Sequence, residues 1–147
     1  MYCVLVYHDV LTLSSDGVAG KVQHDKMGTY KKTTLQLNYR PTYESNDGRN
    51  TVYVTGDGHW VIGPSDQVDE NKTLKGIRSV NVGLITPPFT GWEYYDGNNW
   101  IPDGKLTLAA SGYNIASNLK IFYSLSLQTE APLFLLLLSS SSSSSSS

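Results

Sequence analysis

The segment of residues 91–103, which reads GWEYYDGNNWIPD, concentrates side chains of the types that commonly bind ligands. It holds two of the three tryptophans of the chain, together with adjacent tyrosines and a turn rich in Asp and Asn. Flat indole and phenol rings provide faces on which a sugar can stack, and planar carboxylate and amide groups supply directional hydrogen bonds. This combination is typical of a carbohydrate site. The candidate ligand-binding residues are Tyr95, Asp96, Asn98, Asn99 and Trp100.

Catalytic patterns are scarce in comparison. The three histidines are His8, His24 and His59, and no two of them have the spacing of a helical zinc site. His59 follows Asp57 closely enough to nominate the pair as a base and its orienting carboxylate, although solvated turn residues are the favoured explanation of the pair. The chain has neither a Gly-x-Ser-x-Gly nucleophile motif nor a phosphate-binding glycine loop. We therefore expect no enzymatic activity, no metal and no cofactor, with an uncharacterised hydrolase as the last alternative.

The same aromatic residues have a second interpretation, as the hydrophobic core. The chain has only three Phe but ten Tyr and three Trp. In a small domain the large rings must then supply much of the buried area, at roughly 150–250 Å² each. For Trp100, which adjoins a polar turn, a core position and a binding position are both open. The predicted structural core is Tyr30, Tyr43, Tyr53, Trp60 and Trp92.

Short alternating segments separated by turns predict the elements that hold these residues. Asp-Gly pairs begin at residues 16, 47, 57, 96 and 103, and this dipeptide favours tight hairpin turns with positive φ. Between them, alternating strands are expected at residues 30–39, 51–55, 59–62, 77–82, 91–95, 105–109 and 119–127. Residues 64–75 are polar and are expected to form a surface loop with room for one helical turn. The fold class is therefore all-β, a mostly antiparallel sandwich or small barrel with little or no helix.

One internal echo bears on domain organisation. The tripeptide Leu11-Thr12-Leu13 recurs 95 residues later, at Leu106. It arises either from chance similarity between two strands or from a tandem array in which a second module begins. We expect a β-rich module at residues 2–110, followed at 111–130 by strands that pack on it or open a truncated second module. Residues 131–147, which end in nine serines, are expected to be a disordered low-complexity tail.

Bulk properties exclude several classes of partner. Eleven basic residues against 13 acidic ones give a net charge of −2, which does not favour nucleic acid. The longest leucine-rich run, at residues 133–138, is far shorter than the roughly 20 residues of a membrane-spanning helix. A lone Cys3 allows no internal disulfide and leans towards the cytoplasm, whereas the chain would be extracellular if it is a fragment. Asn71 begins a glycan-acceptor tripeptide, Asn-Lys-Thr.

Several landmarks together resemble an uncharacterised β-rich module of multidomain and tandem-repeat proteins of aquatic animals. The resemblance spans about residues 11–108, and it implies a recognition or scaffolding role without catalytic residues. From the sequence we expect a non-enzymatic interaction module with a protein or glycan partner; the first alternative is a lectin-like domain. The landmarks are the segments at 27–30 (MGTY), 39–43 (YRPTY), 60–63 (WVIG) and 100–103 (WIPD), together with Pro87 and Trp92.

Overall fold

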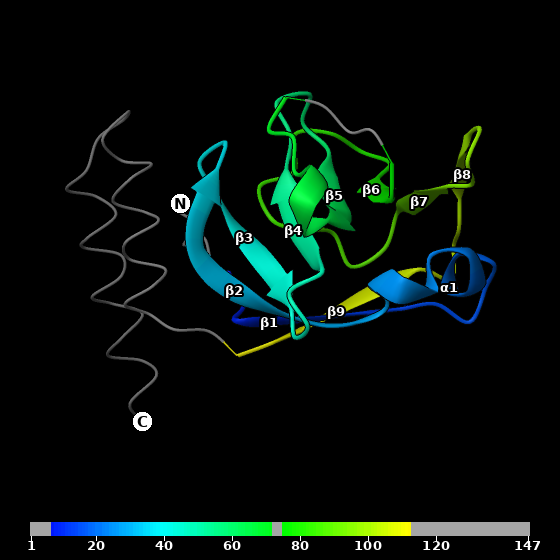
Figure 1. The fold of residues 1–147 in the computed structure, drawn as a ribbon, viewed down its shortest axis with the longest axis horizontal. Coiled ribbons are helices and arrows are strands. Elements are labelled where there is room, and N and C mark those ends of the chain that lie inside the picture. Colours follow the sequence, from blue (N-terminus) through cyan, green and yellow to red (C-terminus); the bar gives the residue numbers. More distant parts are fainter. Residues whose placement is uncertain (1–6, 72–74, 113–147) are drawn as a thin grey trace, which may run out of the picture.

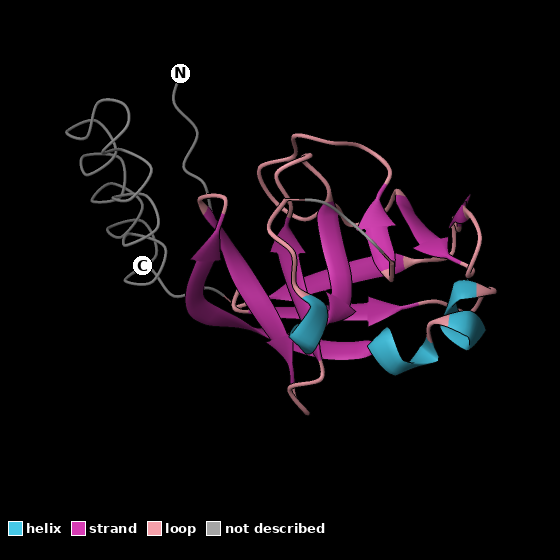
Figure 2. Cartoon of the chain, turned by 45° about the horizontal axis from the view of Figure 1, so that its top comes forward, coloured by secondary structure: helices cyan, strands magenta, loops and turns pink. Residues whose placement is uncertain are grey.

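Antiparallel strands, each hydrogen-bonded to its neighbours, form one sheet in the computed structural model, which describes residues 7–71 and 75–112. The strand order is β8-β7-β6-β5-β4-β3-β2-β1-β9, so β1–β9 is the neighbouring pair that is distant in sequence. Short helices lie in the connections (Figures 1 and 2): α1 (Ala19–Val22), η1 (His24–Lys26) and η2 (Ser65–Gln67). The strands are β1 (Val10–Ser14), β2 (Gly28–Leu37), β3 (Arg40–Ser45), β4 (Asn50–Val54), β5 (Trp60–Pro64), β6 (Ile77–Ser79), β7 (Trp92–Tyr95), β8 (Trp100–Pro102) and β9 (Thr107–Ser111).

The sheet curls around one core and forms a half-barrel (Figure 2). One backbone hydrogen bond outside the ladders joins the end strand β9 to the connection between β6 and β7, since Leu108 N donates to Phe89 O at 2.8 Å. The all-β, antiparallel prediction is confirmed. Of the two architectures expected from the sequence, the barrel-like one is observed, and α1 with η1 is a short helical segment that the sequence pattern did not indicate.

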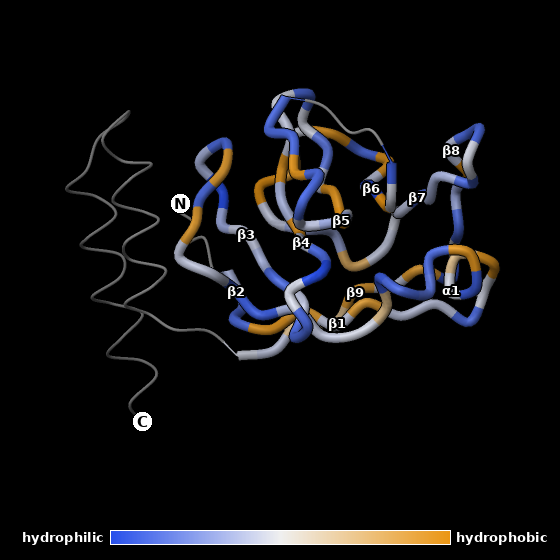
Figure 3. Tube along the Cα trace, in the orientation of Figure 1, coloured by the Kyte–Doolittle hydropathy of each residue, from blue (hydrophilic) through white to orange (hydrophobic). Residues whose placement is uncertain are grey.

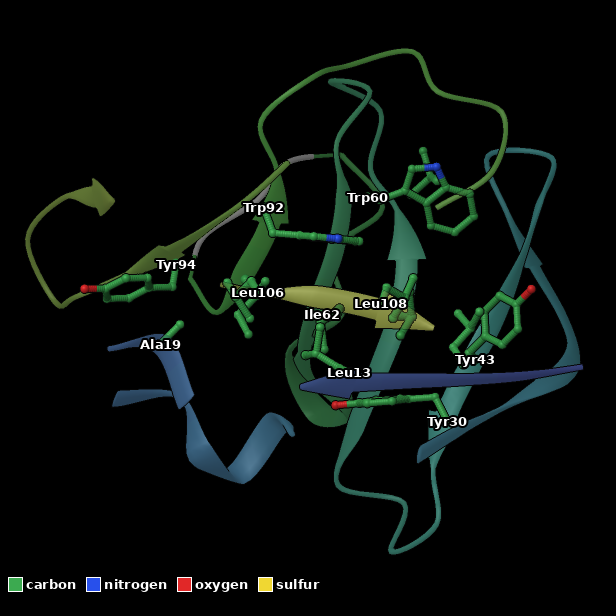
Figure 4. Close-up of a cluster of buried hydrophobic side chains, with 14 of the residues drawn as sticks. Leu13, Ala19, Tyr30, Tyr43, Trp60, Ile62, Trp92, Tyr94, Leu106 and Leu108 are labelled. Carbon is green, nitrogen blue, oxygen red and sulfur yellow. The ribbon is translucent and has the colours of Figure 1, made fainter. Parts of the chain in front are cut away.

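The concave face of the sheet holds the core (Figure 4). Tyr30, Tyr43, Trp60 and Trp92 are all at most 1% exposed and belong to one hydrophobic cluster. Tyr53 is also buried, but it lies outside that cluster. It sits between Val52 and Val54 on β4, and alternation along a strand turns it to the opposite face of the sheet.

Three polar groups of core side chains form hydrogen bonds to the backbone of the long connection between β6 and β7, residues 80–91. The indole Nε1 of Trp60 donates to Leu84 O, and that of Trp92 donates to Pro88 O, both at 2.9 Å. The hydroxyl of Tyr7 donates to Ile85 O, also at 2.9 Å. Buried Trp and Tyr need partners for these groups, so the rings bury apolar area and fix the path of the connection at the same time.

The Asp-Gly pairs divide into two kinds. Gly48, Gly58 and Gly97 have φ of 74°, 93° and 108°, and they form the hairpin turns β3–β4, β4–β5 and β7–β8 as expected. Gly17 and Gly104 do not have positive φ, so these pairs form no such turn. The β2–β3 hairpin instead turns at Asn38 and Tyr39, with φ of 51° and 62°, where the sequence carries no glycine.

The echoed tripeptides are neighbours in space. Leu13 pairs with Leu108 across β1 and β9, and the leucines at 11, 13, 106 and 108 all lie in the same core. The apolar stretches of β1 and β9 run together in Figure 3. Strand β9 is therefore an integral part of this sheet. The strand expected at residues 119–127, the part of the 111–130 segment beyond Gly112 and the tail expected at 131–147 lie outside the described residues.

Candidate functional site

The outward face of β6, β7 and β8 carries a cluster of polar and aromatic side chains. Along β7, Trp92 and Tyr94 point into the core, so alternation turns Glu93 and Tyr95 outwards. The strand register then places Tyr95 directly opposite Trp100 on β8. Their ring centroids are 5.3 Å apart with a tilt of 45° between the planes, the geometry of a cross-strand aromatic pair.

Arg78 joins this aromatic pair from β6. It lies opposite Glu93 in the strand register, and its Nε contacts Glu93 Oε1 at 2.6 Å. The guanidinium carbon also lies 4.1 Å from the centroid of the Trp100 ring, a cation–π contact. The side chains of Arg78 and Glu93 are 22% and 12% exposed, which shields the pair from solvent screening. The pair therefore fixes the orientation of the Trp100 ring.

The turn of residues 96–99 extends the cluster into solvent. Oδ1 of Asp96 accepts hydrogen bonds from the backbone N–H groups of Asn98 at 2.8 Å and Asn99 at 2.7 Å. These two bonds, of which the one from Asn99 has the larger effect, hold the pKa of the Asp96 carboxyl below its ordinary value. The side-chain amides of Asn98 and Asn99 are exposed and donate to no group in the described part of the chain. Asp96 thus shapes the turn, and the two asparagines remain available to a ligand.

A shallow groove runs beside this turn. It has a volume of about 340 Å³ and lies between the α1–η1 segment and the end of β7. Gln23 bridges its sides, because its Nε2 donates to Tyr95 O at 2.7 Å. Lys26, Lys75 and Asp96 all contribute to its lining. The groove gives the aromatic cluster a neighbouring recess with charges of both signs. We call the cluster, the turn and this groove together the β7–β8 surface.

The structure brings together the five residues that the sequence nominated, and it adds two that the sequence analysis missed. Tyr95 and Trp100 pair across strands, and Asp96, Asn98 and Asn99 share one turn. Arg78 and Glu93 were not singled out, because each is one charged residue alternating with buried neighbours on a short strand. The signal was that alternation: Ile77 and Ser79 are buried on either side of Arg78.

The nominated catalytic pair has other bonding partners. His59 Nδ1 lies 2.7 Å from Ser79 O, and the carboxylate of Asp57 accepts a hydrogen bond from the hydroxyl of Thr55. The Thr55–Asp57 bond lies within the β4–β5 turn, and the His59 contact joins that turn to β6. Among residues 7–71 and 75–112, no three His, Cys, Asp or Glu side chains gather closely enough to hold a metal ion. Asn71, the candidate glycan acceptor, is exposed.

Comparison with protein-family models, with curated proteins and with solved structures found no match to the chain. The resemblance of its sequence landmarks to a module of tandem-repeat proteins therefore stays a prediction. Within the described residues, no helix has the length and apolar character needed to cross a membrane.

Proposed function

We propose that this domain is a non-enzymatic recognition module that binds its partner through the β7–β8 surface. The observation that carries the proposal is the Arg78–Trp100–Tyr95 stack, which the ion pair with Glu93 holds on the outward face of the sheet. Tryptophan, tyrosine and arginine are the side chains that dominate binding energy at interfaces. Rings fixed in advance lose little conformational entropy when a partner binds.

A glycan partner is the second candidate, and the 96–99 turn favours it. Two exposed amides, those of Asn98 and Asn99, stand next to the half-buried rings of Tyr95 and Trp100. An amide offers both donors and an acceptor to sugar hydroxyls, and a ring face takes the apolar side of a pyranose. Because Arg78 occupies one face of Trp100, a sugar would stack on Tyr95 or on the remaining indole surface.

Replacement of Trp100 by alanine tests the surface. We expect the free energy of unfolding to fall by about 1–2 kcal/mol, because the variant loses both the aromatic pair with Tyr95 and the cation–π contact with Arg78. Binding should fall by about tenfold or more, as for an interface tryptophan. Glycan-array binding of the folded variant measures the second effect, and circular dichroism confirms that it is folded.

Asparagine variants in two comparable turns provide a second test and its matched control. Combined Asn98→Ala and Asn99→Ala changes should weaken array binding, while Asn46→Ala, an exposed asparagine of the β3–β4 turn, should leave it unchanged. An array on which the wild-type protein binds nothing removes the glycan candidate. Hydrolysis of a model substrate that is lost on His59→Ala would overturn the non-enzymatic proposal itself.

A further inference from the structure

The connection between β1 and α1, residues 15–18, holds an Asp-Gly pair that forms no hairpin turn. Asp16 is exposed, and Gly17 is partly buried. In an Asp-Gly pair the carboxyl group can react with the next backbone nitrogen, because glycine has no side chain to obstruct the approach. The five Asp-Gly pairs of the chain are therefore five possible sites for one reaction. The function proposed above makes no use of the pair at residue 16.

This reaction needs no reagent other than water. The glycine nitrogen loses its proton and forms a bond to Cγ of the aspartate. One carboxyl oxygen leaves as water, with that proton and the proton of the carboxyl group, and a succinimide ring closes. Water then adds to one of the two ring carbonyls. Addition at Cγ restores aspartate, whereas addition at the backbone carbonyl gives isoaspartate, whose main chain runs through the former side chain and is one carbon longer.

Hydrogen bonds restrain the carboxylates of four of the five pairs. A carboxylate held in this way cannot turn its Cγ towards the next backbone nitrogen until the bonds break. The donors are Ser45 and Arg49 for Asp47, Thr55 for Asp57, Asn98 and Asn99 for Asp96, and Ser15, Ala19 and Lys105 for Asp103.

The same bonds keep carboxyl groups ionised. The backbone bond from Arg49 has the largest part in lowering the pKa of Asp47, and the bond from Asn99 has the largest part in lowering that of Asp96. An ionised carboxylate loses an oxygen as water less readily than the protonated acid does. Restraint and ionisation therefore both slow ring closure at these two pairs.

The carboxylate of Asp16 is different. It accepts no hydrogen bond and forms no ion pair within residues 7–71 and 75–112. Its side chain lies in solvent, in a bend that belongs to no helix or strand. Rotation that brings Cγ of Asp16 towards the nitrogen of Gly17 therefore breaks no bond of the carboxylate.

The backbone nitrogens of the five glycines do not reverse this order. Those of Gly17, Gly48 and Gly58 each donate one hydrogen bond within their own turn or bend, at 2.9–3.0 Å. Those of Gly97 and Gly104 donate none to the described residues, but the aspartates before them accept two and three bonds. Among the five pairs, the one at residue 16 combines a comparable nitrogen with an unrestrained carboxylate.

Packing explains why glycine is kept at position 17. A Cβ there would lie 3.0 Å from Asp103 Oδ2 and 3.2 Å from Lys105 Cβ. A larger residue would slow ring closure, but it would also displace Asp103. The close contact between the β1–α1 connection and the β8–β9 turn therefore keeps the reactive pair in place.

We propose that Asp16 is a site of isoaspartate formation in the folded protein, and that this modification loosens the contact of the β1–α1 connection with Asp103. The added main-chain carbon lies between Ser15 and Ala19, which both donate to Asp103 Oδ2, at 3.2 Å and 3.0 Å. A longer backbone between two donors that share one oxygen displaces at least one of them. The modified protein is therefore less stable than the fresh protein.

Incubation of the full chain near neutral pH, folded in buffer and unfolded in urea, tests the site. Peptide mapping with electron-transfer fragmentation measures isoaspartate at each of the five pairs. In the folded protein Asp16 should react about tenfold or more faster than the other four, because breaking a hydrogen bond first slows a reaction by about that factor. In urea the five rates should become similar. A folded-state rate at another pair that equals the rate at Asp16, or a preference for Asp16 that persists in urea, would overturn the proposal.

Asp16→Glu tests the effect on stability. Glutamate keeps the charge, but its longer side chain would have to close a larger and less favourable ring. Before incubation the variant and the wild type should have the same urea midpoint. After incubation the wild-type midpoint should fall in proportion to the isoaspartate at residue 16, and the midpoint of the variant should not change. Equal losses in both proteins, or isoaspartate without a lower midpoint, would show that the modification does not loosen the contact.

Discussion

Replacing Trp60 by alanine should lower the free energy of unfolding by about 3–5 kcal/mol, the range for a large aromatic removed from a core. The side chain is fully buried, and the variant loses both its packing and the hydrogen bond from Nε1 to Leu84 O. A domain of this size has a total stability of roughly 5–15 kcal/mol, so the variant would lose a large share of it. Urea denaturation followed by far-UV circular dichroism measures the loss.

Two variants separate the contributions of Trp60. Trp60→Phe keeps most of the ring volume but removes the indole N–H, so it should recover much of the stability while leaving Leu84 O without its donor. Trp100→Ala removes the same side chain from a half-buried position and should cost far less. If Trp60→Ala and Trp100→Ala shifted the urea midpoint equally, the assignment of Trp60 to the core and of Trp100 to the surface would be wrong.

The contrast between these tryptophans shows how far the sequence could predict the fold. Trp60 and Trp92 were both predicted to lie in the core because the chain has only three Phe and needs its large rings to fill the interior. For Trp100 this argument did not decide between core and surface, because Trp100 adjoins a polar turn. Its half-buried position opposite Tyr95 depends on the strand register.

Other features depend on contacts that a local pattern cannot contain. The hairpin turn at Asn38 and Tyr39 lacks glycine, and Asn38 is held there by bonds to the distant carbonyls of Val54 and Glu70. Arg78 reaches Trp100 across an intervening strand. The buried hydroxyl of Tyr43, which has no hydrogen-bond partner among the described residues, is visible only when every neighbour is placed. Local periodicity predicts which face of the sheet a side chain lies on, whereas the pairing of strands determines which residues it contacts there.

Replacing Asp103 by alanine should lower the free energy of unfolding by about 2 kcal/mol, the range for losing a helix cap or a hydrogen bond to a charged group. Its carboxylate accepts bonds from Ser15 Oγ at 3.2 Å, Ala19 N at 3.0 Å and Lys105 N at 2.9 Å. These contacts connect the β8–β9 turn to the start of α1. Gly17 makes the approach possible, because a Cβ there would lie 2.9 Å from Asp103 Oδ1.

The same contacts make part of the stability depend on pH. Burial acts to raise the pKa of Asp103, but the bonds from Lys105, Ala19 and Ser15 outweigh it and hold the pKa below the ordinary value. A lowered pKa in the folded state stabilises the protein fully above the unfolded value of about 4, and this stability is lost as pH falls through the folded value. The wild-type protein should therefore lose stability on acidification below about pH 4.

Urea midpoints of the wild type and Asp103→Ala, measured between neutral pH and pH 3, test both effects. The variant should be less stable at neutral pH and should lose less on acidification, so the two curves converge at low pH. Asp16→Ala is the matched control, because Asp16 lies in the β1–α1 connection that Asp103 contacts, and its side chain is exposed with no bond to the rest of the described chain. It should follow the wild type throughout. Parallel curves for the wild type and Asp103→Ala would show that the ionised carboxylate does not stabilise the contact between the β8–β9 turn and the start of α1.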